Sequence, residues 1–218
     1  GGISSTVETP QVTLESSFSV MKYCNKCGAG VSVTVPKGDN RPRHVCGSCG
    51  AIHYQNPRVV TGCIAEWRDK VLLCRRAIEP RYGCWTLPAG FLENGESSHA
   101  GAARETLEEA NARVEVTGLY TLFDLPRIDQ IYMLYRGRLL DLDFAPGDES
   151  LEVMLCTRHQ VPWEKLAFQV MRETLKLYFR DQERNDFRMR SGTIEPVAGA
   201  PGSYRTTLLS GSRISQGE

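Results

Sequence analysis

Two pairs of cysteines constrain the start of the chain more than any other feature of the sequence. Cys24 and Cys27 form one CxxC pair, Cys46 and Cys49 form a second, and eighteen residues separate the pairs. This spacing matches a four-thiolate tetrahedral zinc site, in which protein ligands fill every position and the metal is structural. Residues 21–58 hold few large apolar side chains, so they need such a cross-link to fold. We therefore expect a zinc ribbon over these residues; two disulfides, or unpaired buried thiols, are the alternatives.

Composition gives no reason to expect a membrane or a nucleic acid as partner. The 218 residues carry a formal net charge of zero, and no apolar run reaches the ~20 residues that a membrane-spanning helix needs. Five basic side chains lie in the ribbon: Lys22, Lys26, Lys37, Arg41 and Arg43. They leave a nucleic-acid contact open, but we favour a solvated basic surface. Residues 1–20, rich in Ser and Thr without an apolar segment, are expected to form a flexible lead-in.

The middle of the chain, residues 59–183, alternates apolar segments with turns and is expected to form the catalytic domain. The patterns predict strands over residues 59–67, 70–74, 86–87, 114–123, 130–140 and 151–157, and an amphipathic helix over 163–182. Together with a helix near residue 100, this order predicts a mixed sheet covered by helices. Residues 184–218 lack sustained periodicity, so we expect an extended or partly disordered tail.

Three glutamates recur at helical spacing in the middle of this domain. Glu105, Glu108 and Glu109 stand at positions i, i+3 and i+4 of a helix that Ser97 or Ser98 would cap. The small apolar stripe predicted to pack that helix is Ala100, Ala103, Leu107 and Ala110, on the opposite face. The glutamates alone would be read as a solvated face. A glycine-containing turn just before the helix allows a ligand to approach the backbone, and converging carboxylates suit Mg²⁺ or Mn²⁺.

The segment from residue 90 to residue 112 resembles the Nudix box, G-x5-E-x7-R-E-U-x-E-E-x-G-U, where U is a bulky aliphatic residue. Six specified positions fall on the pattern: Gly90, Glu96, Arg104, Glu105, Glu108 and Glu109. Three positions depart from it: Thr106 and Ala112 are less bulky, and Asn111 replaces a glycine. Asn tolerates the left-handed conformation at a helix end, so we expect the turn to survive. The resemblance implies an α/β/α sandwich around a mixed sheet, with the box as loop–helix–loop.

The same resemblance implies a role for each residue of the box. Glu105 and Glu109 would be direct metal ligands, Glu108 a direct or water-mediated one, and the Ala89 carbonyl would add an oxygen. Arg104 would pair with Glu96 or with a box carboxylate and orient it. A ligand or general base from outside the box would come from residues 147–152, where Glu152 is favoured over Glu149. The metal would then neutralise a pyrophosphate and activate the attacking water.

Residues 21–182 are similar to plant chloroplast Nudix hydrolases that cleave FAD and ADP-ribose. The runs YCNKCG, CGAIHYQNPRVVTGCIAEW, LLCRRAIEPRYGCWTLPAGFLENGES and FAPGDESLEVMLC carry this similarity. It implies a small dinucleotide substrate, with FAD cleaved to FMN and AMP and ADP-ribose to AMP and ribose 5-phosphate. It also implies a chloroplast location, and members of this fold often form homodimers. Tyr82, Trp85 and Phe123 would stack on a ring if they are not core residues, and Arg76 would contact phosphates if it is not merely solvated.

Two other functions remain open. A zinc ribbon before a Nudix domain also occurs in NADH pyrophosphatases, and an RNA-cap-trimming enzyme of that kind is the second enzyme reading. Those pyrophosphatases carry an SQPWPFP-like signature after the box, where this chain has YTLFDLPRIDQIYMLY. From another class, a nucleotide sensor or zinc-ribbon binding module would be expected to have lost box carboxylates, and all of them are present here.

Overall fold

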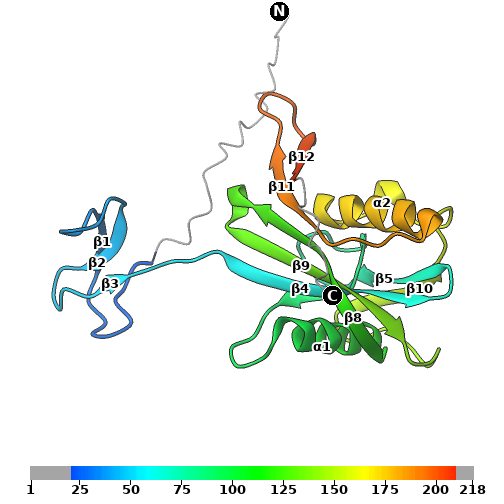
Figure 1. The fold of residues 1–218 in the computed structure, drawn as a ribbon. Coiled ribbons are helices and arrows are strands. Elements are labelled where there is room, and N and C mark those ends of the chain that lie inside the picture. The colour runs from blue at the N-terminus through cyan, green and yellow to red at the C-terminus, as the bar shows by residue number, and fades with distance from the viewer. Residues whose placement is uncertain (1–20, 210–218) are drawn as a thin grey trace, which may run out of the picture. The chain divides into compact units, whose positions relative to one another are not determined.

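A computed structural model describes residues 21–209 of the chain (Figure 1). The chain divides into two compact units, one that ends at Asn56 and one that begins at Pro57. The predicted lead-in, residues 1–20, lies outside the described residues, as do residues 210–218 of the predicted tail. No helix in the described part is long and apolar enough to cross a membrane.

The first unit is a small three-stranded antiparallel sheet. It consists of β1 (Val31–Thr34), β2 (Arg43–Cys46) and β3 (Ile52–His53), with β2 in the middle. Strand β1 has no buried residue, β2 has two and β3 has one, and two of the most buried side chains of the unit are the cysteines Cys24 and Cys46. The unit therefore has almost no apolar core of its own, as expected for a fold that a metal stabilises.

The second unit is built on a nine-stranded mixed sheet with the order β10-β5-β4-β9-β8-β11-β12, to which β6 and β7 add short pairings. The strands are β4 (Arg58–Trp67), β5 (Lys70–Arg76), β6 (Trp85–Thr86), β7 (Ala89–Phe91), β8 (Val114–Leu125), β9 (Gln130–Leu139), β10 (Ser150–Cys156), β11 (Arg190–Pro196) and β12 (Tyr204–Leu208). The β4–β9 and β8–β11 pairs are parallel and the others are antiparallel. The predicted mixed sheet is confirmed.

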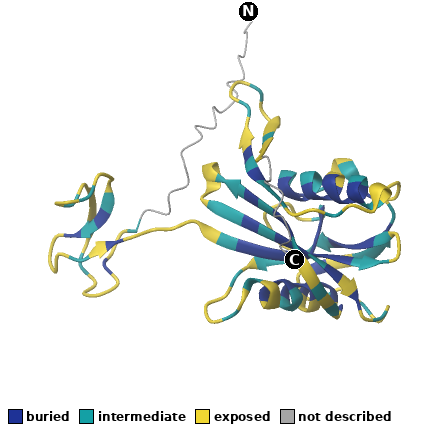
Figure 2. Ribbon diagram, viewed as in Figure 1, coloured by how far each residue is buried: buried dark blue, intermediate teal, exposed yellow. Residues whose placement is uncertain are grey.

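Two helices cover opposite faces of this sheet (Figure 1). Helix α1 (Ser98–Ala110) lies on one face and α2 (Gln169–Arg184) on the other. The buried apolar residues form two clusters, one that includes Val170 and Leu175 of α2 and one that includes Ala102 and Ala110 of α1. Figure 2 shows buried residues, in dark blue, on both helices and along the sheet between them. Short 3-10 turns, η1 (Pro126–Ile128) and η2 (Trp163–Lys165), precede β9 and α2. The helix predicted from residue 163 thus begins only at Gln169, because the chain is extended at Leu166 and Phe168.

Residues 184–218 were expected to form an extended or partly disordered tail, but two strands form within their described part. Strands β11 and β12 form a hairpin, and β11 pairs in parallel with β8. The guanidinium of Arg190, at the start of β11, donates to the buried carboxylate of Asp181 on α2. A Cβ at Gly192 would lie 2.2 Å from the carbonyl oxygen of Thr207, so only glycine lets the two strands approach this closely. Contacts with distant elements hold β11 in place. The strand therefore forms although its own sequence shows little periodicity.

Candidate metal and substrate site

Helix α1 begins and ends where its sequence predicts. The side chain of Ser97 caps the first turn by accepting from the Ala100 amide at 3.4 Å. Asn111 ends the helix in the left-handed conformation, with φ 48°, in place of the expected glycine. Its side-chain amide also donates to the carbonyl oxygens of Ala145 and Pro146, both at 3.2 Å. The departure from the box pattern at Asn111 therefore preserves the turn and adds a link to the loop before β10.

The face that α1 buries differs from the predicted one. Leu107, assigned to the packing stripe, is 49% exposed, whereas Glu105 and Glu109 are 8% and 6% exposed. The buried positions of the helix are Gly101, Ala102, Glu105, Thr106, Glu109 and Ala110. A Cβ at Gly101 would lie 2.8 Å from Thr61 on β4, so the helix packs too closely for a bulky residue. The predicted grouping of all three glutamates opposite the packing face is wrong: two lie on that face and Glu108 is exposed.

The two buried carboxylates lie against strand β7. The Ala89 amide donates to Oε2 of Glu109 at 3.2 Å. A Cβ at Gly90 would lie 2.4 Å from Oε2 of Glu105, so glycine is needed there to make room for that carboxylate. Burial raises the pKa of Glu109 to about 8, and the charge of Glu105 adds to this rise. Burial also raises the pKa of Glu105. Two desolvated acids side by side are poorly stabilised as anions, and a hard divalent cation suits this donor set.

Arg104 organises the carboxylates of the box. Its Nη2 and Nε donate to the two oxygens of Glu96 at 2.7 and 3.1 Å. Its Nη1 donates to Glu105 at 2.7 Å and to Glu108 at 2.9 Å. Arg104 was predicted to pair with either Glu96 or a box carboxylate, and in the structure it pairs with both kinds of partner. The hydrogen bonds from Arg104 lower the pKa of Glu96 to about 2, so Glu96 is a fixed anion that orients the guanidinium.

The loop before β10 is attached to the end of α1 through its backbone. The Gly147 amide donates to the carbonyl oxygen of Glu109 at 3.0 Å. A Cβ at Gly147 would lie 1.8 Å from the backbone carbonyl oxygen of Glu108, so only glycine fits there. The negative charge of Glu149 contributes to the raised pKa of both Glu105 and Glu109. Glu152 instead forms an ion pair with Arg75 at 3.0 Å. The electrostatic effect of Glu149 on both buried carboxylates favours Glu149, rather than Glu152, as the acid from outside the box.

A pocket of about 520 Å³ opens beside the carboxylates. Four arginines line it, Arg76, Arg81, Arg127 and Arg172, and none of the described residues that line it is acidic. Ala89 lines the pocket and also donates to Glu109. The positive charge of Arg76 lowers the pKa of Glu109 against the effect of burial. The pocket and the two buried carboxylates are therefore electrostatically connected, and the pocket suits an anionic ligand.

The predicted substrate contacts are only partly brought together. Arg76 lines the pocket, donates from Nε to the carbonyl oxygen of Pro80 at 2.9 Å and lies over the ring of Phe168. Trp85 and Phe123 are buried in the apolar core, so they are core residues and do not stack on a substrate ring. Tyr82 is exposed and does not line the pocket. The aromatic residues that line it were missed: Phe91, Tyr132, Phe168 and Tyr204.

The four cysteines of the first unit fit a structural zinc ion. Their sulfur atoms all lie within 4.8 Å of one another, with Cys24–Cys49 at 3.7 Å and Cys27–Cys46 at 3.5 Å. A Zn–S bond of about 2.3 Å gives tetrahedral sulfur–sulfur distances of about 3.8 Å. The same distances exclude the disulfide alternative, and all eight cysteines are free. Backbone amides of Lys26 and Cys49 donate to sulfurs at 3.4 Å, as expected around thiolates.

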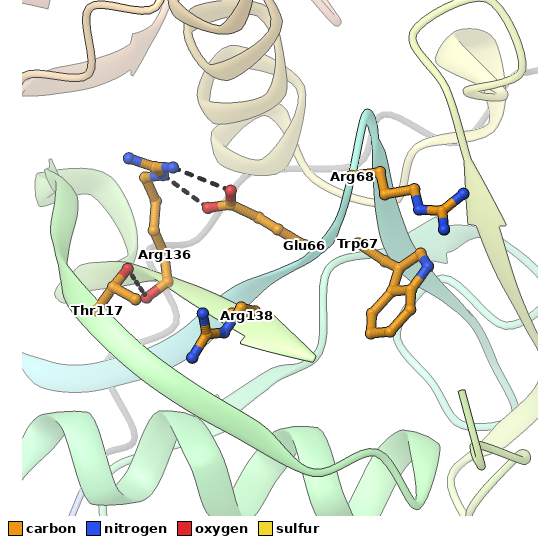
Figure 3. A pocket seen from close by; sticks show the side chains of 6 residues that line it. All are labelled: Glu66, Trp67, Arg68, Thr117, Arg136 and Arg138. Carbon is orange, nitrogen blue, oxygen red and sulfur yellow. Dashed lines mark hydrogen bonds and ion pairs between the residues drawn. The ribbon is translucent and has the colours of Figure 1, made fainter. Parts of the chain in front are cut away.

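Another hollow, of about 400 Å³, lies near the far end of β4 from the site (Figure 3). Glu66, Trp67 and Arg68 line one side of it, and Arg136 and Arg138 line the other. Arg136 donates to both oxygens of Glu66, at 2.6 and 2.9 Å, and Arg138 pairs with Glu115. Both arginines are therefore paired with glutamates, and Glu66 itself lines the hollow, whereas none of the described residues that line the pocket beside the carboxylates is acidic.

Comparisons with known proteins agree with this geometry. Family models described as NUDIX domain and as Nudix N-terminal match residues 56–178 and 22–55. A NUDIX hydrolase from Nitrosomonas europaea with a solved structure is 54% identical, with a TM-score of 0.78, covering 80% of this chain and 99% of that one.

Two curated relatives differ in the activity that their names state. An ADP-ribose pyrophosphatase of Methanocaldococcus jannaschii is 31% identical over 124 residues, which are 53% of this chain and 69% of the relative. An NAD-capped RNA hydrolase, NudC, of Edwardsiella ictaluri is 29% identical over 139 residues, which are 63% of this chain and 49% of the relative. The chain thus spans about half the length of the second relative. It belongs to the Nudix family, with a zinc ribbon before the Nudix domain.

Proposed function

We propose that this chain is a Mg²⁺- or Mn²⁺-dependent pyrophosphohydrolase that cleaves FAD to FMN and AMP, and ADP-ribose to AMP and ribose 5-phosphate. The observation that carries this proposal is the junction at β7. Two buried carboxylates, Glu105 and Glu109, lie there beside a pocket. Four arginines line this pocket, and none of its described lining residues is acidic; one of the four, Arg172, pairs with Glu164 at 3.4 Å. A divalent cation on the acids and a diphosphate against the arginines would neutralise both halves of this arrangement.

Each residue of the site has a task in this reaction. Glu105 and Glu109 would hold the ion, with Glu108 as a further ligand, direct or through water, and the Ala89 carbonyl as an added oxygen. When bound, the ion supplies positive charge to the phosphoanhydride and lowers the pKa of a water. Arg76 binds the phosphates, because it lines the pocket and its charge already acts on Glu109. Glu149 accepts the proton of the attacking water, since its charge reaches both buried carboxylates.

FAD is proposed first because of the similarity to plant chloroplast Nudix hydrolases and because aromatic side chains line the pocket. ADP-ribose cleavage is supported by the archaeal relative. The chloroplast location rests on the same plant similarity and stays a prediction.

Hydrolysis of NAD-capped RNA is the second candidate function, supported by the NudC relatives and by the first unit. That unit has five Lys or Arg side chains, and two tyrosines, Tyr23 and Tyr54, are exposed on it. Basic and aromatic side chains together are typical of surfaces that bind single-stranded RNA.

A substrate panel tests the proposal. Full-length protein with Mg²⁺ is offered FAD, ADP-ribose, NADH and NAD-capped RNA in separate reactions, and AMP release or cap removal is followed. We expect the largest kcat/KM for FAD and the next for ADP-ribose. Cleavage of NADH or capped RNA with FAD left intact would overturn the substrate proposal. The absence of Mg²⁺-dependent cleavage in every reaction would overturn the hydrolase itself.

A further inference from the structure

The pocket extends across the sheet from the carboxylates to the C-terminal hairpin. In register, Val60 of β4 is beside Tyr132 of β9, and Gln130 of β9 is opposite Leu125 of β8. Thr193 of β11 pairs with Asp124, which places Ile194 next to Leu125. All of these except Thr193 and Asp124 line the pocket. From β7 to β11 there are four steps between strands of about 4.8 Å each, so the pocket spans roughly 19 Å.

The two ends of the pocket differ in chemistry. At the β7 end, Ala89 and Arg76 adjoin the metal-binding carboxylates. At the hairpin end the lining is mostly apolar or aromatic, with one charged side chain, Arg127, among Leu125, Ile128, Ile194, Pro196 and Tyr204. The side-chain amides that could read the edge of an adenine, Gln130 and Gln169, come from β9 and α2 rather than from the hairpin. The hairpin end therefore suits a planar ring with an apolar edge.

The hairpin is held firmly enough to act as a wall. Asp181 on α2 is 1% exposed and accepts from both Arg190 and the hydroxyl of Tyr120. Gly192 lets β12 pack tightly on β11. Tyr204 begins β12 opposite Pro196 and is 45% exposed, so its ring is available to a ligand in the pocket.

We propose that the β11–β12 hairpin, chiefly through Tyr204, binds the flavin ring of FAD and so selects FAD over ADP-ribose. This inference rests on the proposed function. It deepens that proposal by assigning a binding site to the flavin ring of FAD, which ADP-ribose lacks. The adenosine half and the diphosphate are bound by other elements of the same pocket. The hairpin thus determines specificity and takes no part in the bond cleavage.

The experiment replaces Tyr204 and follows both substrates. Tyr204→Ala should raise KM for FAD about five- to tenfold, the loss of an aromatic contact, with kcat within about twofold. KM for ADP-ribose should stay unchanged, and Tyr204→Phe should restore KM for FAD. Leu208→Ala is the matched control, because Leu208 is exposed on the same strand and does not line the pocket. Thermal unfolding of each variant checks that the hairpin remains folded.

Binding of FMN separates this inference from the proposed function. FMN is not hydrolysed, so its binding, followed by flavin fluorescence, tests the hairpin even if no substrate is cleaved. We expect Tyr204→Ala to weaken FMN binding about five- to tenfold and to leave AMP binding unchanged. Equal KM values for FAD in the wild type and Tyr204→Ala would overturn the inference, and so would equal increases for FAD and ADP-ribose. Cleavage of ADP-ribose by all variants would then leave the hydrolase proposal standing.

Discussion

The two metal-binding regions of this chain differ in how their ligands are brought together. In the zinc ribbon, four sulfurs lie within 4.8 Å of one another and close a tetrahedron by themselves. In the Nudix domain, Glu105 and Glu109 come from one helix, but β7 and the loop before β10 complete their surroundings. The first site needs little besides its ligands, whereas the second needs the whole sheet. A closed thiolate site therefore serves folding, and an open carboxylate site leaves positions for a substrate.

The largest effect should follow from removing zinc. Replacing Cys46 by Ala removes one ligand of the tetrahedron, and the first unit has almost no apolar core to compensate. Structural zinc contributes about 10–16 kcal/mol of apparent folding free energy in small peptides. We expect amide hydrogen exchange over residues 21–56 to become unprotected while α1 and β4 keep their protection. Cys156→Ala is the control, because that thiol is buried in the second unit. Retained protection in Cys46→Ala would mean that the ribbon folds without its metal.

The next largest effect should follow from Glu109→Gln, which keeps the shape of the side chain and removes a negative charge. Loss of one charged group at a site of this kind lowers turnover on the order of 10²–10³-fold. The measurement is AMP release from FAD over a range of Mg²⁺ concentrations. Glu115→Gln serves as control, since Glu115 pairs with Arg138 away from the pocket. An unaffected rate in Glu109→Gln would show that Glu109 does not hold the catalytic ion. Nucleotide binding in both proteins without AMP release from the wild type would instead favour a nucleotide sensor.

A smaller effect is expected at Arg104, which orients the carboxylates of the open site. The guanidinium contacts Glu96, Glu105 and Glu108 together. Lysine keeps the charge but cannot place planar donors on three carboxylates at once. Arg104→Lys should therefore raise the Mg²⁺ concentration needed for half-maximal activity about 10–100-fold, as for other residues that orient metal ligands. Arg113→Lys, an exposed arginine just after the helix that pairs with Asp141, should leave the Mg²⁺ dependence unchanged. Equal Mg²⁺ curves for both variants would show that Arg104 only stabilises the fold.

The same contrast explains how much could be predicted from the sequence. The cysteine spacing predicted the zinc site because its four ligands are nearly sufficient, and the box spacing predicted the family and the helix ends. The buried face of α1 was not predictable from hydrophobicity, because Leu107 is exposed and two glutamates are buried. For Trp85 and Phe123 the sequence left a substrate contact open beside the favoured core position, and the packing places both in the core.

The C-terminal hairpin was missed for a related reason. Its strands are short, and their partners, β8 and Asp181 of α2, are distant in sequence. Pairings of this kind depend on the sheet already being formed, so local composition gives no signal for them. Ile194 and Pro196 lie on one face of β11, and only the structure shows that this face lines the pocket together with Leu125.

The smallest effect should be a pH dependence that is confined to the carboxylate region. Arg104 lowers the pKa of Glu96 to about 2 from its ordinary value of 4.5. A carboxyl with a lowered pKa contributes stability above pH 4.5 and loses it as the pH falls toward 2, because protonation breaks the ion pair. Glu96→Gln should therefore unfold at a lower temperature than the wild type at pH 7, and the difference should shrink below pH 4.5. Zinc loss in acid affects both proteins alike and cancels in the comparison. A difference that stays constant down to pH 2.5 would mean that shape, and not the charge of Glu96, holds Arg104 in place.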